Sequence, residues 1–167
     1  MIEGTPTRST NSEAAALAAE LRLIDAGDAW HGPALADLLE GVSAEAAAAR
    51  PIAACHSIWE LVGHISGWND VWRRRLDGEV VDEPEAGDFP PTPAVTEKAW
   101  AAAKDRLREA HAGLVARVAA LTAAELDARI PGREFTARFM VEGAIRHVVY
   151  HSGQIGLLRK ALAGGGA

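Results

Sequence analysis

The stretch from Thr136 to Leu162 constrains the fold most, because its apolar residues recur every three or four positions. This is the period of one face of an α-helix, and a long helix with one apolar face must bury that face against other helices. Two histidines interrupt the stripe, whose members are Met140, Ala144, His147, His151, Ile155, Leu158 and Leu162. The sequence therefore predicts that this helix packs inside a helical bundle.

Three further long helices are expected before it. Ser12 is a candidate N-cap for the first, and Ser57 followed by Glu60 has the spacing of a capping box for the second. Pro33 suits the first turn of a short helix. The long helices are predicted over residues 12–29, 57–76, 92–121 and 136–162, and short helical turns over residues 33–41, 43–50 and 123–127.

This order of elements predicts an all-α fold, a four-helix bundle with short additional helical turns. A chain of 167 residues fits one domain, which we place at residues 12–163. The polar N-terminus, residues 1–11, and the glycine-rich tail, residues 164–167, are expected to be disordered.

The longest connection, residues 79–93, contains four prolines and five acidic residues. Such a segment is too polar to form core, and long loops without secondary structure are more often functional or mobile than structural. We therefore expect an acidic loop that borders the mouth of a site.

Charge and hydropathy exclude two classes of partner. The net charge of −6 argues against a nucleic-acid-binding protein, which usually presents a basic stripe. The run Arg73-Arg74-Arg75 is predicted to be a solvated helix face, since a helix spreads three neighbours over about 200°. No segment approaches the roughly 20 apolar residues that span a bilayer. We expect neither nucleic acid nor membrane as a partner.

Cys55 is the only cysteine, so an intramolecular disulfide and thiolate metal clusters are excluded. The N-terminal residues lack the apolar core of a signal peptide. Together these features predict a cytoplasmic location. Cys55 precedes a helix start, a position that can lower a thiol pKa, but with no partner in view it is expected to be inert.

Three histidines lie at predicted core positions. His147 and His151 are four residues apart, which places both imidazoles on one helix face, and His64 interrupts the apolar stripe of the helix 57–76. Burying three imidazoles is costly unless each finds a partner. One divalent ion supplies a partner for all three and leaves a coordination position open. Zn or Ni is favoured over Mg or Ca. The alternative is a hydrogen-bonded core without metal.

Two polar residues beside the triad are candidate catalytic groups. Glu60 lies one turn before His64, where it is either an outer-sphere acceptor or general base or only a capping-box residue. Gln154 lies one turn after His151 and either meets a substrate or holds helix packing.

The remaining histidines and the tryptophans are expected to have structural roles outside the triad. We expect His31 and His56 to hydrogen-bond near helix starts, and His111, on a charged helix face, to be exposed. The tryptophans of the helix 57–76 are expected to be core around the site: Trp59, Trp68 and Trp72.

The stretch His56 to Ile65, followed by Trp68, resembles the second helix of the DinB/YfiT-like superfamily. His147 to Ile155 is similar to that family's closing His-x-x-x-His-x-Gly-Gln motif, and residues 30–33 and 79–93 lie where its DinB-like branch would have them. The similarity runs from residue 30 to residue 162. It implies a four-helix bundle, often a homodimer, with His64, His147 and His151 as a metal triad. Members of the superfamily include transferases and isomerases that use low-molecular-weight thiols, and metal-dependent hydrolases.

Two hypotheses for function follow. The first is a divalent-metal-dependent enzyme acting on a small-molecule substrate, a thiol-dependent S-transferase or a hydrolase. The second is a non-catalytic metal-binding protein of the stress response. DNA binding, a third idea suggested by the family name, is disfavoured by the negative charge. The motifs do not separate thiol transfer from hydrolysis, and no residue pattern encodes the substrate.

Overall fold

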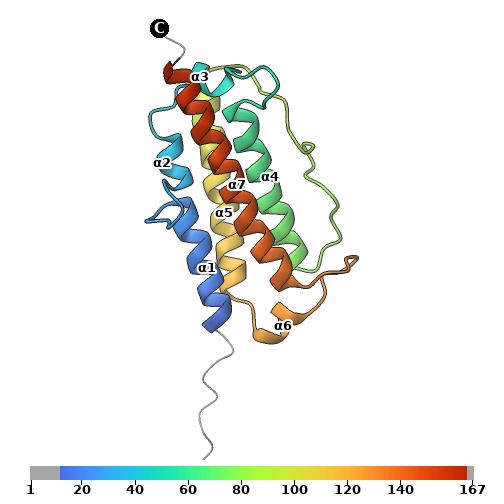
Figure 1. Ribbon diagram of the computed structural model, residues 1–167. Helices are drawn as coiled ribbons and strands as arrows, with labels where there is room; N and C mark the ends of the chain where they lie inside the picture. Colours follow the sequence, from blue (N-terminus) through green and yellow to red (C-terminus); the bar gives the residue numbers. More distant parts are fainter. Residues whose placement is uncertain (1–11, 165–167) are drawn as a thin grey trace, which may run out of the picture.

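Four long helices run along a common axis and form the body of the molecule (Figure 1). The computed structural model describes residues 12–164, and within them it contains seven helices and no strand. The all-α prediction is confirmed. The helices are α1 (Ser12–Asp25), α2 (Leu35–Leu39), α3 (Ala44–Ala48), α4 (Ile58–Leu76), α5 (Glu97–Ala119), α6 (Ala123–Asp127) and α7 (Ala137–Gly164).

The helices pack in a closed ring in which α4 contacts α5, α5 contacts α1, α1 contacts α7, and α7 contacts α4. Helices α1 and α7 run in one direction, and α4 and α5 run in the opposite one (Figure 1). Because α4 and α5 are parallel, the chain between them must return along the whole bundle. That return is the α4–α5 loop, residues 77–96. Within residues 12–164 no helix has the length and apolarity needed to cross a bilayer.

Local capping residues determine where most of the helices begin. The Ser57 hydroxyl accepts a hydrogen bond from the Glu60 backbone N–H, and the Glu60 carboxylate accepts one from the Ser57 N–H, so the predicted capping box is confirmed. Helix α5 begins later than predicted, because Thr96 is its N-cap. Pro33 lies before the N-cap of α2 rather than in its first turn. Ser12 is the first residue of α1, whereas the sequence predicts it as the N-cap that precedes this helix.

The predicted stripe of α7 faces the ring interior. Met140, Ala144, His151 and Ile155 are buried, and His147 is half-buried. The first helix is shorter than predicted, ending at Asp25, and α7 is longer, ending at Gly164. The disorder expected for residues 1–11 and 165–167 concerns residues that lie outside the described part of the chain. Gly164, predicted in the disordered tail, is instead the last residue of α7.

The α4–α5 loop packs along α4 instead of standing free of it. Side chains at two glycines of α4 would collide with loop prolines, since a Cβ at Gly63 would lie 2.7 Å from Pro90 and one at Gly67 would lie 2.9 Å from Pro84. Pro84 is buried. The missing side chains of the two glycines therefore open the notch that receives the loop.

Arg75 secures the same loop, which corrects the prediction of a solvated arginine face. Its guanidinium is buried and donates to the carbonyl oxygens of Val81 and Asp82, each at 2.8 Å. The loop carbonyls lack partners of their own in an irregular segment, so a fixed cation is a good donor for them. Arg73 and Arg74 form surface ion pairs, as expected of solvated residues.

Candidate metal centre

Helices α4 and α7 bring the three predicted histidines together. The Nε2 atoms of His64 and His147 are 2.8 Å apart, and those of His147 and His151 are 3.1 Å apart. The three ligand atoms all lie within 4.8 Å of one another. Ligand nitrogens around a tetrahedral zinc are about 3.3 Å apart, given Zn–N bonds of about 2.0–2.1 Å. The two measured separations are within about 0.5 Å of that spacing.

The loop determines which nitrogen of His64 carries the hydrogen. His64 Nδ1 lies 2.8 Å from the backbone oxygen of Asp88 and 3.1 Å from its carboxylate. Both partners only accept hydrogen bonds, so Nδ1 must carry the hydrogen. A neutral imidazole has only one N–H, and therefore the Nε2 of His64 presents a bare lone pair to the other histidines.

Gln154 does the same for His151. Its Oε1 lies 2.6 Å from His151 Nδ1, while its Nε2 donates to the Tyr150 hydroxyl at 3.2 Å. His151 Nδ1 is thus a donor, and its Nε2 is a second bare lone pair. The assignment follows from the orientation of the amide, whose oxygen faces His151 and whose nitrogen faces Tyr150.

When the three imidazoles are neutral, the converging Nε2 atoms consequently share at most one hydrogen. Only His147 can supply it, and His147 Nε2 faces two lone pairs but can donate to one of them. With the hydrogen on His147 Nε2, one inward lone pair is left without a donor; with the hydrogen on His147 Nδ1, both short contacts set lone pair against lone pair, which is repulsive. His147 Nδ1 has no hydrogen-bond partner among the described residues. A cation between the three nitrogens removes the repulsion, so the donor set fits a divalent metal such as Zn or Ni.

Protonation of the cluster is disfavoured by its surroundings. Burial, followed by the proximity of His151 and His64, lowers the pKa of His147 to about 3. Burial also lowers the pKa of His151, although the Gln154 hydrogen bond opposes this. These two histidines are therefore neutral at neutral pH, the state in which imidazole binds metals.

Aromatic rings enclose the triad. Phe89 of the loop lies between two imidazoles, with its centroid 3.7 Å from that of His56 and 4.1 Å from that of His64, all three rings nearly parallel. The rings of Trp72 and His147 are nearly perpendicular, with their centroids 5.0 Å apart. The tryptophan N–H of Trp68 donates to the Asp88 carboxylate. The loop thus covers the triad and orients one of its members.

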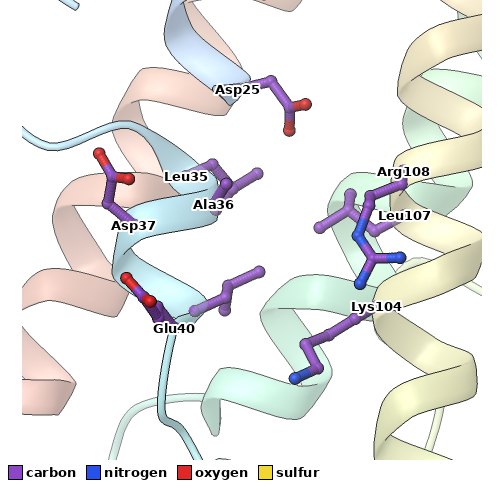
Figure 2. Close-up of a pocket in the computed structure, with 9 residues that line it drawn as sticks. Asp25, Leu35, Ala36, Asp37, Glu40, Lys104, Leu107 and Arg108 are labelled. Atoms are coloured by element: carbon purple, nitrogen blue, oxygen red, sulfur yellow. The ribbon is translucent and has the colours of Figure 1, made fainter. Parts of the chain in front are cut away.

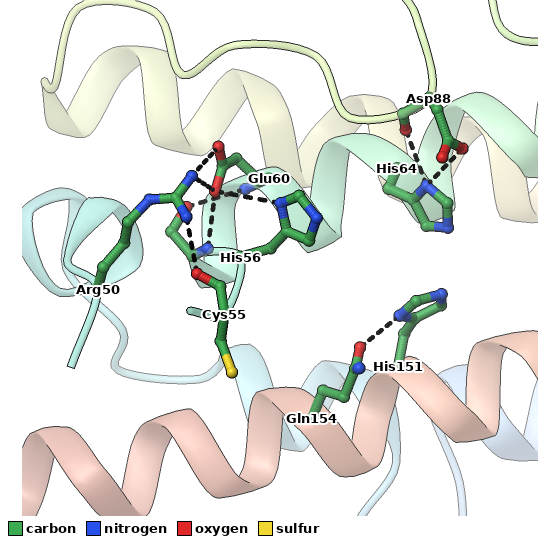
Figure 3. A network of polar contacts seen from close by, with 9 residues as sticks. Arg50, Cys55, His56, Glu60, His64, Asp88, His151 and Gln154 are labelled. Atoms are coloured by element: carbon green, nitrogen blue, oxygen red, sulfur yellow. Dashed lines mark hydrogen bonds and ion pairs between the residues drawn. The ribbon is translucent and has the colours of Figure 1, made fainter. Parts of the chain in front are cut away.

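The remaining predicted residues lie at different distances from the triad. Glu60 makes no hydrogen bond to the three histidines, and its carboxylate binds the Arg50 guanidinium and approaches His56 at 3.7 Å (Figure 3). Gln154 contacts the triad directly. His31 and Cys55 are exposed, and neither hydrogen-bonds to the triad within the described residues.

His111 corrects a prediction, because it is buried and not exposed. Its Nε2 donates to the carbonyl oxygen of Leu21 on α1 at 2.9 Å, and its Nδ1 accepts from the Asn69 amide of α4 at 3.3 Å. The charged neighbours of His111 on α5 indicated solvent. Sequence alone carried no sign that two other helices close over this one position.

Asp88 and Phe89 are the site residues that sequence reasoning missed. The loop was expected at the mouth of a site, but irregular segments have no period that tells which side chain turns inward. A signal was nevertheless present in the two glycines of α4, whose spacing of four residues marks a face on which another segment can lie.

A second cavity lies away from the triad, between α1, α2 and α5 (Figure 2). Acidic side chains of Asp25, Asp37 and Glu40 border one side, and Lys104 and Arg108 border the other. None of the triad histidines lines it. We assign no function to this cavity.

Comparison with known proteins identifies the family of the chain. No curated protein and no solved structure matches the chain significantly. A family model described as the DinB superfamily matches residues 29–155. This span holds all three histidines, the α4–α5 loop, all of α4 and α5 and most of α7, and it excludes α1. The chain belongs to the DinB superfamily.

Proposed function

We propose that the protein is a divalent-metal-dependent enzyme that transfers a low-molecular-weight thiol, or water, to a small electrophilic substrate. The observation that supports this most is the under-protonated cluster, in which three Nε2 atoms converge with at most one hydrogen among them. A metal held by three imidazoles supplies a Lewis acid that lowers the pKa of a thiol or water, with a coordination position to spare.

The chain's own residues would have separate tasks. His64, His147 and His151 are the proposed ligands. Asp88 and Gln154 hold two of them in the tautomer that points a lone pair inward, which is the usual task of groups hydrogen-bonded to metal ligands. Phe89 and Trp72 exclude water from the buried side. Glu60 is proposed as an outer support that holds His56, and through it Phe89, in place.

The first test is metal content. Protein purified without a nickel column should hold close to one equivalent of metal, or take it up from Zn or Ni solutions. The His147→Ala variant should lose this metal and keep its helical circular dichroism. His31→Ala is the matched control, because it removes an exposed histidine. A wild-type protein that takes up less than about 0.1 equivalent would exclude the site.

The second test is turnover. The loaded protein is mixed with a low-molecular-weight thiol and a chloro-dinitroaryl compound, so that an S–C bond forms, chloride leaves and the thiol proton passes to solvent. Release of the thioether should be faster with the loaded wild-type protein than with His147→Ala. Equal rates in the two would rule out the transferase, and hydrolysis of an activated ester then tests water as nucleophile.

A second candidate is a metal-binding protein without turnover. It is favoured by the low exposure of the ligands, 5% for His64 and 6% for His151, beneath a loop held by prolines and Arg75. Bound metal with no acceleration of either reaction would support it.

A further inference from the structure

A small apolar cavity opens between the start of α4 and the second half of α7. Its volume is about 200 Å³, and Ile52, Leu61, Leu157 and Leu158 form apolar walls. Leu61 and Leu158 are buried, whereas Ile52 and Leu157 keep exposed fractions of 42% and 63%. Exposed leucine and isoleucine side chains around a hollow are unfavourable in water unless something apolar covers them.

The polar end of the cavity leads to the triad. Gln154 lines the cavity and accepts the hydrogen bond of His151 Nδ1. His56 also lines it and stacks on Phe89, which stacks on His64. Figure 3 shows Cys55, His56 and Gln154 around this space, with the Cys55 sulfur directed toward α7. One side chain, Gln154, thus separates the cavity from His151, and two, His56 and Phe89, separate it from His64.

We propose that this cavity binds the apolar group of the substrate, one aromatic ring or a compact alkyl group, and holds the electrophilic atom toward Gln154 and the triad. This inference rests on the proposed function. Volume supports the ligand class, since an apolar cavity of about 150 Å³ accommodates benzene. Charge supports it too, because no carboxylate, lysine or arginine lines the cavity. Small-molecule binding sites are usually apolar cavities with a few polar groups at one end.

The binding test uses toluene and the metal-free protein, so that it does not depend on the metal. Amide NMR shifts should saturate and be confined to residues near 52–61 and 154–158. Leu157→Glu should weaken binding at least about tenfold, since a carboxylate would be desolvated beside the ligand. Leu23→Glu is the matched control, an exposed leucine on α1. Leu157→Met should retain binding. Shifts that do not saturate, or equal affinity in Leu157→Glu, would overturn the proposal.

A second copy of the chain is the competing occupant. If shifts at residues 154–158 changed with protein concentration in the absence of toluene, and Leu157→Glu abolished that change, the apolar face would belong to a dimer and the substrate assignment would fail.

A kinetic experiment tests whether the cavity binds the substrate that reacts at the triad. With the metal-loaded protein and a thiol, Leu157→Glu should raise KM for benzyl chloride at least fivefold more than it raises KM for chloroacetamide. Both reactions form an S–C bond and release chloride. Equal effects on the two would overturn the assignment of the ring to the cavity. Toluene binding without any metal uptake would instead retain the cavity and refute the metal-dependent function.

Discussion

Two groups of buried histidines differ in whether their hydrogen bonds can all be made. At His111 one nitrogen donates to the Leu21 carbonyl and the other accepts from Asn69, so a single neutral tautomer satisfies both. At the triad, Asp88 and Gln154 take the available hydrogens outward and leave bare nitrogens facing inward. Burial does not explain the difference, because His111 is 2% exposed and His64 and His151 are 5% and 6% exposed, while His147 is half-buried.

The difference shows that a buried histidine is informative only together with its partners. His111 fits the ordinary rule that buried polar groups are hydrogen-bonded. The triad departs from it, and such departures occur where a ligand completes the site. The comparison predicts that the two groups respond oppositely to metal and to substitution.

The largest expected effect is on metal affinity. His147→Ala should weaken binding of Zn or Ni by about a thousandfold or more, because one of three ligands is lost. His111→Ala should leave affinity within about twofold of wild type, since its contacts are with α1 and α4 backbone and amide groups outside the triad. Competition with a chromophoric chelator measures both. Equal losses in the two variants would mean that His147 acts on the fold alone.

The free energy of unfolding should show the reverse order, with a larger loss in His111→Ala than in His147→Ala. His111→Ala is expected to lower the free energy of unfolding by about 3 kcal/mol, because the Leu21 carbonyl and the Asn69 amide lose their partner and a cavity remains. In metal-free protein, His147→Ala should cost less, since His147 donates at most one hydrogen bond within the triad and its Nδ1 has no partner among the described residues. Urea denaturation of both variants without metal decides this. A larger loss in His147→Ala would contradict the proton assignment.

The groups that orient the ligands should have a smaller effect. Gln154→Ala should weaken metal binding about 10- to 100-fold, because His151 loses the acceptor that fixes its tautomer. Gln154→Glu keeps an acceptor at that place and should restore most of the affinity. Asn69→Ala is the control from the other histidine group. Unchanged affinity in Gln154→Ala would show that the tautomer is fixed by other contacts.

The smallest expected effect is on the pH dependence of the stability of the metal-free protein. Burial and the neighbouring imidazoles depress the pKa of His147 from 6.5 to about 3. Between these values the unfolded chain binds a proton at this residue and the folded chain does not, so stability rises with pH from about 3 to 6.5 and falls as pH drops through that window. The slope from His147 should be below about 1.4 kcal/mol per pH unit, since the side chain is partly solvated. The total slope of the free energy of unfolding against pH should be smaller in His147→Ala and unchanged in His31→Ala.

Sequence reasoning succeeded where local period determines the outcome. The apolar stripe of α7 and the Ser57 capping box identified two of the long helices, and the positions of His64, His147 and His151 on core faces identified the cluster. It was wrong about His111 and Arg75, because both lie among charged neighbours on their own helices and find partners on other segments.

The sequence by itself determined which faces of the helices are apolar and which residues interrupt them, because helical periodicity fixes the direction of each side chain relative to its neighbours. Only the tertiary structure decided what those faces meet. The loop backbone at Asp88 and the amide of Gln154 set the hydrogens of His64 and His151 through contacts that no spacing encodes. Helix α4 with its loop and α7 lie far apart in sequence, and their packing turns three histidines of separate stripes into one site that a divalent metal fits.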